Sequence, residues 1–221
     1  LPFDSDVNDD SDNPFTITAS GDAAISSAQS KFGGYSLALD GSGDYLTVGS
    51  SQSAMAFSRD FTIEFWMYFT SLSGSYVGPM GCHSGSGWLF QFANSGGRFY
   101  IDGSNILNTT ATTSTSQWYH VAVSRSGSTI KLFIDGVEQE SITNSSALPT
   151  NNDLIIGASN ASGQYFPGYL DDIRIIDGVG RYTKNFIPPS QAVGATLTGA
   201  NETNTTTDFT ALYLPFTADI N

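Results

Sequence analysis

Oxygen-bearing side chains crowd the start of the chain and suit a hard cation. Residues 4–13 read DSDVNDDSDN and include five aspartates. Calcium takes about six to eight oxygen ligands from carboxylates, amides and backbone carbonyls. The segment lacks the loop glycine and the closing glutamate of an EF-hand. We expect calcium as a cofactor, with a solvated acidic loop as the alternative; the candidate ligands here are Asp4, Asp6 and Asp12.

Aromatic residues beside polar or glycine-rich segments form the second set of candidates. A sugar ring presents an apolar C–H face and a rim of hydroxyls, so its site combines exposed rings with polar side chains. We expect Trp66 and Trp118 to belong to the core instead. For each remaining candidate the alternative is packing against its own sheet. The candidate ligand-binding residues are Tyr76, His83, Trp88, Tyr100 and Tyr165.

The arrangement of carboxylates and serines argues against catalysis. Asp171 and Asp172 are adjacent on an expected strand, so their side chains point to opposite faces and cannot act as an acid–base pair. The serines lack the Gly-x-Ser-x-Gly setting that exposes a hydrolase nucleophile. We therefore expect that the protein is not an enzyme.

Composition limits the possible partners. The net charge of −13 repels phosphate backbones and anionic membranes, so we expect no nucleic-acid partner. No apolar stretch approaches the roughly 20 residues of a membrane span, and no signal peptide is visible. The chain does not begin with Met, which suggests a processed or excised product. The sole cysteine, Cys82, is expected to be a buried and inert thiol.

The segments that must position the candidates read as strands throughout, without a sustained helical period. We expect residues 61–69 to lie centrally in a sheet, because both of their faces carry large apolar groups. Phe65, Val121, Val123, Leu132 and Ile134 should face the inside. The expected strands are 35–39, 45–48, 61–69, 88–93, 98–101, 118–125, 129–134, 154–156 and 169–176.

Three motifs in a fixed order resemble the laminin-G-like, concanavalin-A-like jelly rolls. They are KFGGYSL leading to DGSGDYL (31–46), WYHVAV leading to KLFIDG (118–136), and GYLDDIRI (168–175). The resemblance implies an all-β, antiparallel two-sheet jelly-roll sandwich. It also implies a calcium between Asp4 or Asp6 and Asp171, unless Asp171 accepts a bond from a backbone amide or Arg174. Glucanases of that fold need a Glu-x-Asp-x-Glu strand, which this sequence lacks.

The segment DDIRIIDGVGRYTKNFIPP (171–189) resembles a subtype found in structural proteins of phages and in bacterial surface proteins. It implies an extracellular location on a virion or bacterial cell surface. We expect a non-catalytic module that binds a cell-surface glycan or polysaccharide, or attaches to a surface, beside other subunits of the assembly. The alternatives are a ligand-free spacer or decoration module and a glucanase or lyase of the same fold.

The organisation along the chain suggests one domain and a tail. Residues 1–193 make up the jelly-roll domain, and residues 194–208 read as a polar linker. Residues 209–221 are either a terminal strand or the start of a further repeat, since Leu-Pro-Phe occurs at both 1–3 and 214–216.

Overall fold

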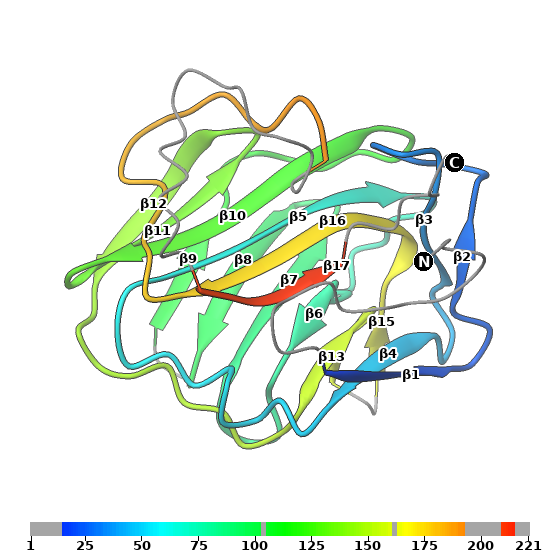
Figure 1. Ribbon diagram of the computed structural model, residues 1–221. Helices are drawn as coiled ribbons and strands as arrows, with labels where there is room; N and C mark the ends of the chain where they lie inside the picture. Colours follow the sequence, from blue (N-terminus) through cyan, green and yellow to red (C-terminus); the bar gives the residue numbers. More distant parts are fainter. Residues whose placement is uncertain (1–14, 103–104, 161–162, 193–208, 215–221) are drawn as a thin grey trace.

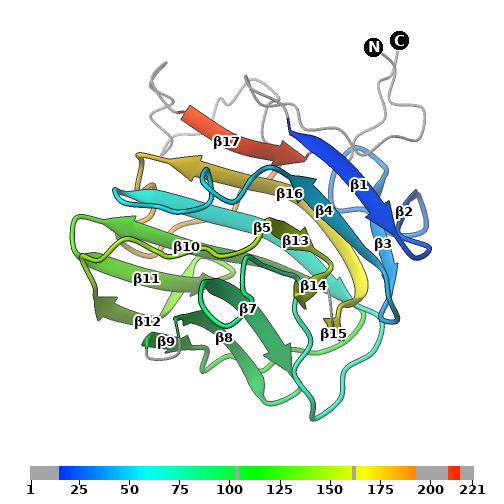
Figure 2. The same ribbon diagram turned by 90° about the horizontal axis from the view of Figure 1, so that it is seen from below.

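The computed structural model describes residues 15–102, 105–160, 163–192 and 209–214. In these ranges the chain forms two large antiparallel sheets that lie face to face as two layers (Figures 1 and 2). The all-β jelly-roll sandwich expected from the sequence is thus confirmed. The same ranges hold no helix of the length and hydropathy that a membrane span requires.

Sheet A is the layer that carries the candidate site. Its strands run in the order β1–β4–β13–β6–β7–β8–β9. A short hairpin of β14 (Ala158–Asn160) and β15 (Gly163–Tyr165) lies next to β6. The strands of sheet A are β1 (Thr16–Ser20), β4 (Tyr45–Gly49), β13 (Leu154–Ile156), β6 (Met80–Gly81), β7 (Trp88–Ala93), β8 (Gly96–Ile101) and β9 (Asn105–Asn108).

Sheet B is the second layer, with the order β12–β11–β10–β5–β16–β3–β2. The predicted central position of residues 61–69 is correct, because β5 lies between β10 and β16. The strands are β12 (Val137–Thr143), β11 (Thr129–Ile134), β10 (Trp118–Ser126), β5 (Phe61–Phe69), β16 (Pro167–Asp177), β3 (Ser36–Asp40) and β2 (Ala24–Ser26).

The core lies between the two sheets and follows the period of two along each strand. The five inward-facing residues predicted from the sequence are all buried. Rings from opposite layers meet there: Phe65 of β5 and Phe90 of β7 are edge to face, with 5.1 Å between ring centroids. Cys82 is buried as expected, and burial raises the pKa of its thiol.

The two tryptophans expected in this core lie on the outer face of sheet B instead. Trp66 is only 5% exposed, but its cover is Lys31, whose Nζ lies 3.8 Å from the ring centroid, and Phe32. Trp118 is half-buried beside Tyr68. Their strands alternate, so burying Phe65 and Val121 between the sheets turns both tryptophans outward.

Residues 209–214 form strand β17 (Phe209–Leu214), which pairs antiparallel with β16. This pairing is compatible with both sequence-based interpretations, a terminal strand and the start of a further repeat. The predicted linker, residues 194–208, lies outside the described residues.

Candidate ligand-binding pocket

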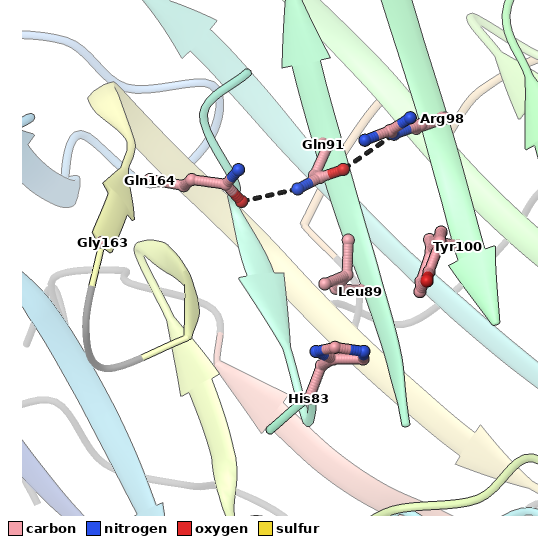
Figure 3. A pocket seen from close by; sticks show the side chains of 7 residues that line it. All are labelled: His83, Leu89, Gln91, Arg98, Tyr100, Gly163 and Gln164. Atoms are coloured by element: carbon pink, nitrogen blue, oxygen red, sulfur yellow. Dashed lines mark hydrogen bonds between the residues drawn. The ribbon is translucent and has the colours of Figure 1, made fainter. Parts of the chain in front are cut away.

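A pocket of about 410 Å³ opens on the outer face of sheet A (Figure 3). We call it the sheet A pocket. Strand β7 supplies its floor, because Trp88, Phe90 and Phe92 turn into the core and leave the intervening side chains on the outside. The lining residues are His83, Leu89, Gln91, Arg98, Tyr100, Gly163 and Gln164.

The antiparallel register of β7 and β8 sets the pocket's side chains against one another. Gln91 is opposite Arg98, and Leu89 is opposite Tyr100. Cross-strand neighbours of this kind have Cβ atoms roughly 4.5–5.5 Å apart, so their side chains interact directly. The pocket therefore has a polar pair at one end and an apolar–aromatic pair at the other.

Three polar side chains form a continuous hydrogen-bonded row. Arg98 Nε donates to Gln91 Oε1 at 2.7 Å, and Gln91 Nε2 donates to Gln164 Oε1 at 2.5 Å. Figure 3 shows Gln91 between the other two. Gln91 is only 6% exposed, whereas Gln164 is exposed, so the row runs from the sheet out to the rim.

Aromatic rings fix the positions of the remaining groups. The Arg98 guanidinium lies over the ring of Tyr76, 4.1 Å from its centroid. His83 and Tyr100 meet edge to face with 5.6 Å between ring centroids. A guanidinium stacked on an aromatic face keeps its plane fixed while its N–H groups point sideways.

Two loops hold the pocket's outer residues. Gly78 N donates to the Gln164 carbonyl at 2.8 Å and fixes the hairpin beside β7. Gln164 has a φ of 58°, a left-handed conformation that costs a non-glycine residue energy and needs such support. In the loop before β7, the amide of Ser84 donates to Asn151 Oδ1 at 2.9 Å.

The structure brings most of the predicted ligand-binding residues to one side of the molecule. His83 and Tyr100 line the pocket, and Tyr76 borders it through Arg98. Tyr165 follows Gln164 in the hairpin but stacks on Tyr45, with ring centroids 6.3 Å apart. Whether these residues bind a ligand stays a prediction.

Trp88 is the exception. It is 0% exposed, and its indole Nε1 donates to the Met55 carbonyl at 3.0 Å inside the core. The sequence placed it beside a glycine-rich loop, but Trp88 is the first residue of the inward-facing set on β7. It therefore offers no face to a ligand, and the alternative of packing against its own sheet is the right one.

Sequence reasoning missed Gln91, Arg98 and Gln164. A signal for the first two was present: Gln91 interrupts the apolar run of residues 88–93, on the face opposite the large aromatics. Arg98 and Tyr100 also alternate with Phe99, which marks them as outward neighbours. Gln164 had no such signal, because it joins the row across 73 positions of sequence.

The acidic candidates for calcium are not brought together among the described residues. Asp4, Asp6 and Asp12 lie outside the described ranges, and within those ranges no group of three His, Cys, Asp or Glu is placed to hold a metal ion. Asp171 Oδ2 accepts the amides of Lys31 at 2.8 Å and Phe32 at 3.1 Å. These bonds give the Asp171 carboxyl a structural role among the described residues, and the calcium prediction stays untested.

Asp171 instead fastens the loop of residues 31–35 to β16. Its Oδ1 also accepts the amide of Asp172, where a bulge interrupts the pairing of β16 with β5. Burial raises the pKa of Asp171 to about 8, although the backbone amides of Phe32 and Lys31 oppose the shift. The carboxyl is thus a buried structural group.

A second polar cluster, on the outer face of sheet B, is closed to solvent. Glu64 accepts hydrogen bonds from Arg174 Nε at 2.7 Å and from Tyr182 Oη at 2.7 Å, and His120 Nε2 lies 3.2 Å away. We call these four residues the Glu64 cluster. Burial alone would raise the pKa of Glu64, but Arg174, His120 and Tyr182 together hold it well below its usual value.

The segment after β16 covers the Glu64 cluster and appears in orange in Figure 1. Tyr182 and Phe186 stack with 3.7 Å between ring centroids, and the amide of Phe186 donates to the Gly136 carbonyl at 2.9 Å. The RYTKNF sequence therefore has a structural task, namely sealing this face of the sheet.

Comparisons with solved structures find the same fold. Domain 4 of AbnA, an extracellular arabinanase from Geobacillus stearothermophilus solved with arabinotriose, has 21% identity and a TM-score of 0.59, covering 76% of this chain and 84% of that one. A putative carbohydrate binding protein from Bacteroides ovatus has 15% identity and a TM-score of 0.54, covering 91% and 51%. The binding domain of botulinum neurotoxin serotype D has 14% identity and a TM-score of 0.56, covering 82% and 47%.

A search of curated proteins gave no match. The sequence profile described as "Concanavalin A-like lectin/glucanases superfamily" matches residues 40–180, which is more than half of the chain. This range includes β5, β10 and the β7–β8 pair, so it spans both sheets and the pocket. The chain therefore belongs to the concanavalin A-like lectin/glucanases superfamily.

Proposed function

We propose that the protein is a non-catalytic carbohydrate-binding module whose ligand lies in the sheet A pocket. The observation that carries the proposal is the composition of this pocket. An aromatic ring, Tyr100, stands beside a row of amide and guanidinium groups in a hollow of about 410 Å³. Pockets of roughly 300–1,000 Å³ with a few convergent polar groups are typical of small-ligand sites.

Relatives with the same fold support a sugar as the ligand. The arabinanase domain was solved with arabinotriose, and the Bacteroides ovatus protein is described as a putative carbohydrate binding protein. A sugar ring stacks its C–H face on an aromatic side chain and presents hydroxyls to amides. Tyr100 and Gln164 offer these two kinds of contact from neighbouring elements.

The lining also supports binding without catalysis. Glycoside hydrolysis needs two carboxyl groups, one of them an acid and the other a base or nucleophile. The lining described for the pocket contains none. The deeply buried Glu64 belongs to the opposite face and is saturated by Arg174, His120 and Tyr182.

The setting we propose is an extracellular one. The RYTKNF…PP segment resembles that of phage structural and bacterial surface proteins, and a module of this kind would attach a virion or a cell to a surface glycan or polysaccharide. Other subunits of the assembly would then supply several copies. Multiple copies raise apparent affinity by roughly 10² to 10⁴ without any new contact.

The test is binding of a multivalent display of the domain to a broad glycan array and to bacterial and host cells. Tyr100→Ala should abolish the binding while leaving the melting temperature nearly unchanged, because Tyr100 is half-buried on the outer face of the sheet and lies outside the core. Tyr35→Ala is the matched control, since Tyr35 is a 36% exposed tyrosine on the sheet B side.

Two results would contradict the proposal. Binding that survives Tyr100→Ala but is lost in Tyr35→Ala would place the ligand elsewhere. A multivalent display that binds neither glycan nor cells would favour the ligand-free spacer instead.

A further inference from the structure

The donor and acceptor roles in the polar row follow from chemistry alone. A guanidinium can only donate hydrogen bonds, so the atom of Gln91 that faces Arg98 Nε must be the carbonyl oxygen. The amide nitrogen of Gln91 then faces Gln164 and donates, so Gln164 accepts through its own oxygen. The orientation of both amides is therefore set by Arg98.

This order leaves free N–H donors at both ends of the row. The oxygens of Gln91 and Gln164 each already accept a bond from within the row. The N–H groups of the row that remain for a ligand are those on the two terminal nitrogens of Arg98 and on the Nε2 of Gln164, while each amide oxygen keeps one lone pair. The row shown in Figure 3 thus has free N–H donors at both of its ends.

The charge of the pocket is positive, which also suits a ligand that accepts hydrogen bonds. Among the described residues, its lining includes Arg98 and no aspartate or glutamate. Elsewhere in the described part of the chain, Arg59, Lys131 and Arg174 each form an ion pair with a carboxylate. In a protein with 21 acidic residues against 8 basic ones, Arg98 is a half-buried arginine that bonds to Gln91 and lies near the rings of Tyr76 and Tyr100.

We infer that the sheet A pocket takes a sugar that carries a carboxylate, such as a uronic acid or a sialic acid residue. This inference rests on the proposed function and names its ligand class. The carboxylate accepts from the Nη1 and Nη2 groups of Arg98, and Gln164 Nε2 donates to a neighbouring oxygen. The sugar ring lies against Tyr100.

The geometry of Arg98 favours a carboxylate over a hydroxyl. Its Nε is held by Gln91, so the end-on fork of the two terminal nitrogens remains, and contact with the Tyr76 ring restrains the guanidinium. Two parallel N–H groups match the two oxygens of a carboxylate. The net charge of −13 does not prevent this contact, because charges farther away than about 10 Å are screened at 0.1 M salt.

The experiment compares oligosaccharides that differ only in the carboxyl group. The probes are tetragalacturonate with its carboxyl-reduced counterpart, and 3′-sialyllactose with lactose, measured by the multivalent display in 0.15 M salt. We expect the acidic member of one pair to bind about tenfold or more tightly than its neutral partner, since charge-assisted hydrogen bonds are roughly twice as strong as neutral ones. The pair that shows the difference identifies the source of the carboxylate.

Arg98→Gln and Arg98→Lys are the diagnostic variants. Gln removes the charge and should erase the preference for the acidic sugar. Lys keeps the charge but lacks the two parallel N–H groups, so it should keep only part of that preference. Arg59→Gln is the matched control, because Arg59 is exposed and bound to Asp177 away from the pocket. Melting temperatures of all three should stay near that of the wild type.

Two results would overturn the inference in different ways. Equal or tighter binding of the neutral sugars, or an acid preference that survives Arg98→Gln, would refute the carboxylate while leaving the proposed glycan binding intact. Absence of binding to both pairs and to a broad glycan array would overturn the proposed function together with the inference.

Discussion

The outer faces of the two sheets carry similar residues, which are covered on sheet B and open on sheet A. On sheet B, Arg174, His120 and Tyr182 converge on one carboxylate, Glu64, and a covering segment excludes water. On sheet A an arginine, a histidine and a tyrosine also gather, as Arg98, His83 and Tyr100, but around an open pocket. The difference is the carboxylate, which Glu64 supplies on sheet B and which the described lining of the sheet A pocket lacks.

This contrast separates groups that stabilise the fold from groups that remain available to a ligand. A buried arginine needs a partner, because leaving either charge of a buried pair alone costs several kcal/mol. Arg174 meets this requirement within the chain. Arg98 is only half-buried, so water can solvate its terminal nitrogens until a ligand replaces it.

The largest effect should come from removing the carboxylate of the Glu64 cluster. Glu64→Ala leaves the Arg174 charge buried without its ion-pair partner and should lower the free energy of unfolding by about 3–5 kcal/mol. Gln91→Ala on the other face removes the hydrogen bonds of Gln91 to Arg98 and Gln164 at the edge of the pocket. It should cost about 1–2 kcal/mol. Urea unfolding measures both. Equal losses would show that the two faces do not differ in the way described.

Next in size is the contrast between two aromatic residues on neighbouring strands of sheet A. Trp88→Ala opens a cavity in the core and should cost about 3–5 kcal/mol of stability. Tyr100→Ala, on the outer side of the same sheet, should cost about 1 kcal/mol or less. Thermal and urea unfolding test this pair, and a fully stable Trp88→Ala variant would contradict the placement of Trp88 in the core.

A smaller effect concerns Asp171, the carboxyl on the sheet B side that backbone amides hold. Its pKa is raised from 3.8 to about 8 by burial, so the folded state keeps a proton that the unfolded chain loses. Its contribution to stability is therefore complete below about pH 4 and declines as the pH rises toward 8. Asp171→Asn should remove this decline, as measured by urea unfolding across pH 4–9.

Two observations would correct this account of Asp171. An unchanged pH profile in Asp171→Asn would show that its carboxyl is not protonated in the folded state. A melting temperature that falls with chelator in the wild type but not in Asp171→Asn would show instead that Asp171 binds calcium, as the resemblance implies. Glu64 does not affect this part of the pH profile. Because its pKa is lowered, its contribution to stability is lost only as the pH falls below about 4.5.

The sequence was sufficient for the strands whose side chains alternate and for the sheet that they form. Residues 61–69, 88–93, 129–134 and 154–156 are strands with the predicted bounds. Strands β1 and β2 were missed, because most of their side chains are small or polar and none is buried, so they lack the apolar pattern of a core strand. Alternation also predicted the inward side of β10, while the outer cover of Trp66 depends on a loop 34 or 35 positions away.

The site was predictable only where the residues share a strand or adjoin a loop. His83 and Tyr100 were recognised as aromatic groups near polar segments, and the β7–β8 register explains why Gln91 and Arg98 join them. The row that ends at Gln164 depends on where a hairpin from residues 158–165 docks beside β7. Long-range docking of that kind has no signature in the local sequence.

The most direct test of the central claim is a ¹⁵N NMR titration of the protein with the best-binding oligosaccharide. We expect shift changes in the side-chain amides of Gln91 and Gln164, in Arg98 Nε–H and in the backbone of residues 83 and 98–100. The Arg174 Nε–H and the amides of residues 182–186 should stay unchanged, because the Glu64 cluster is closed. Changes confined to the sheet B residues, with Arg98 and Gln164 unaffected, would contradict the assignment of the ligand to the sheet A pocket.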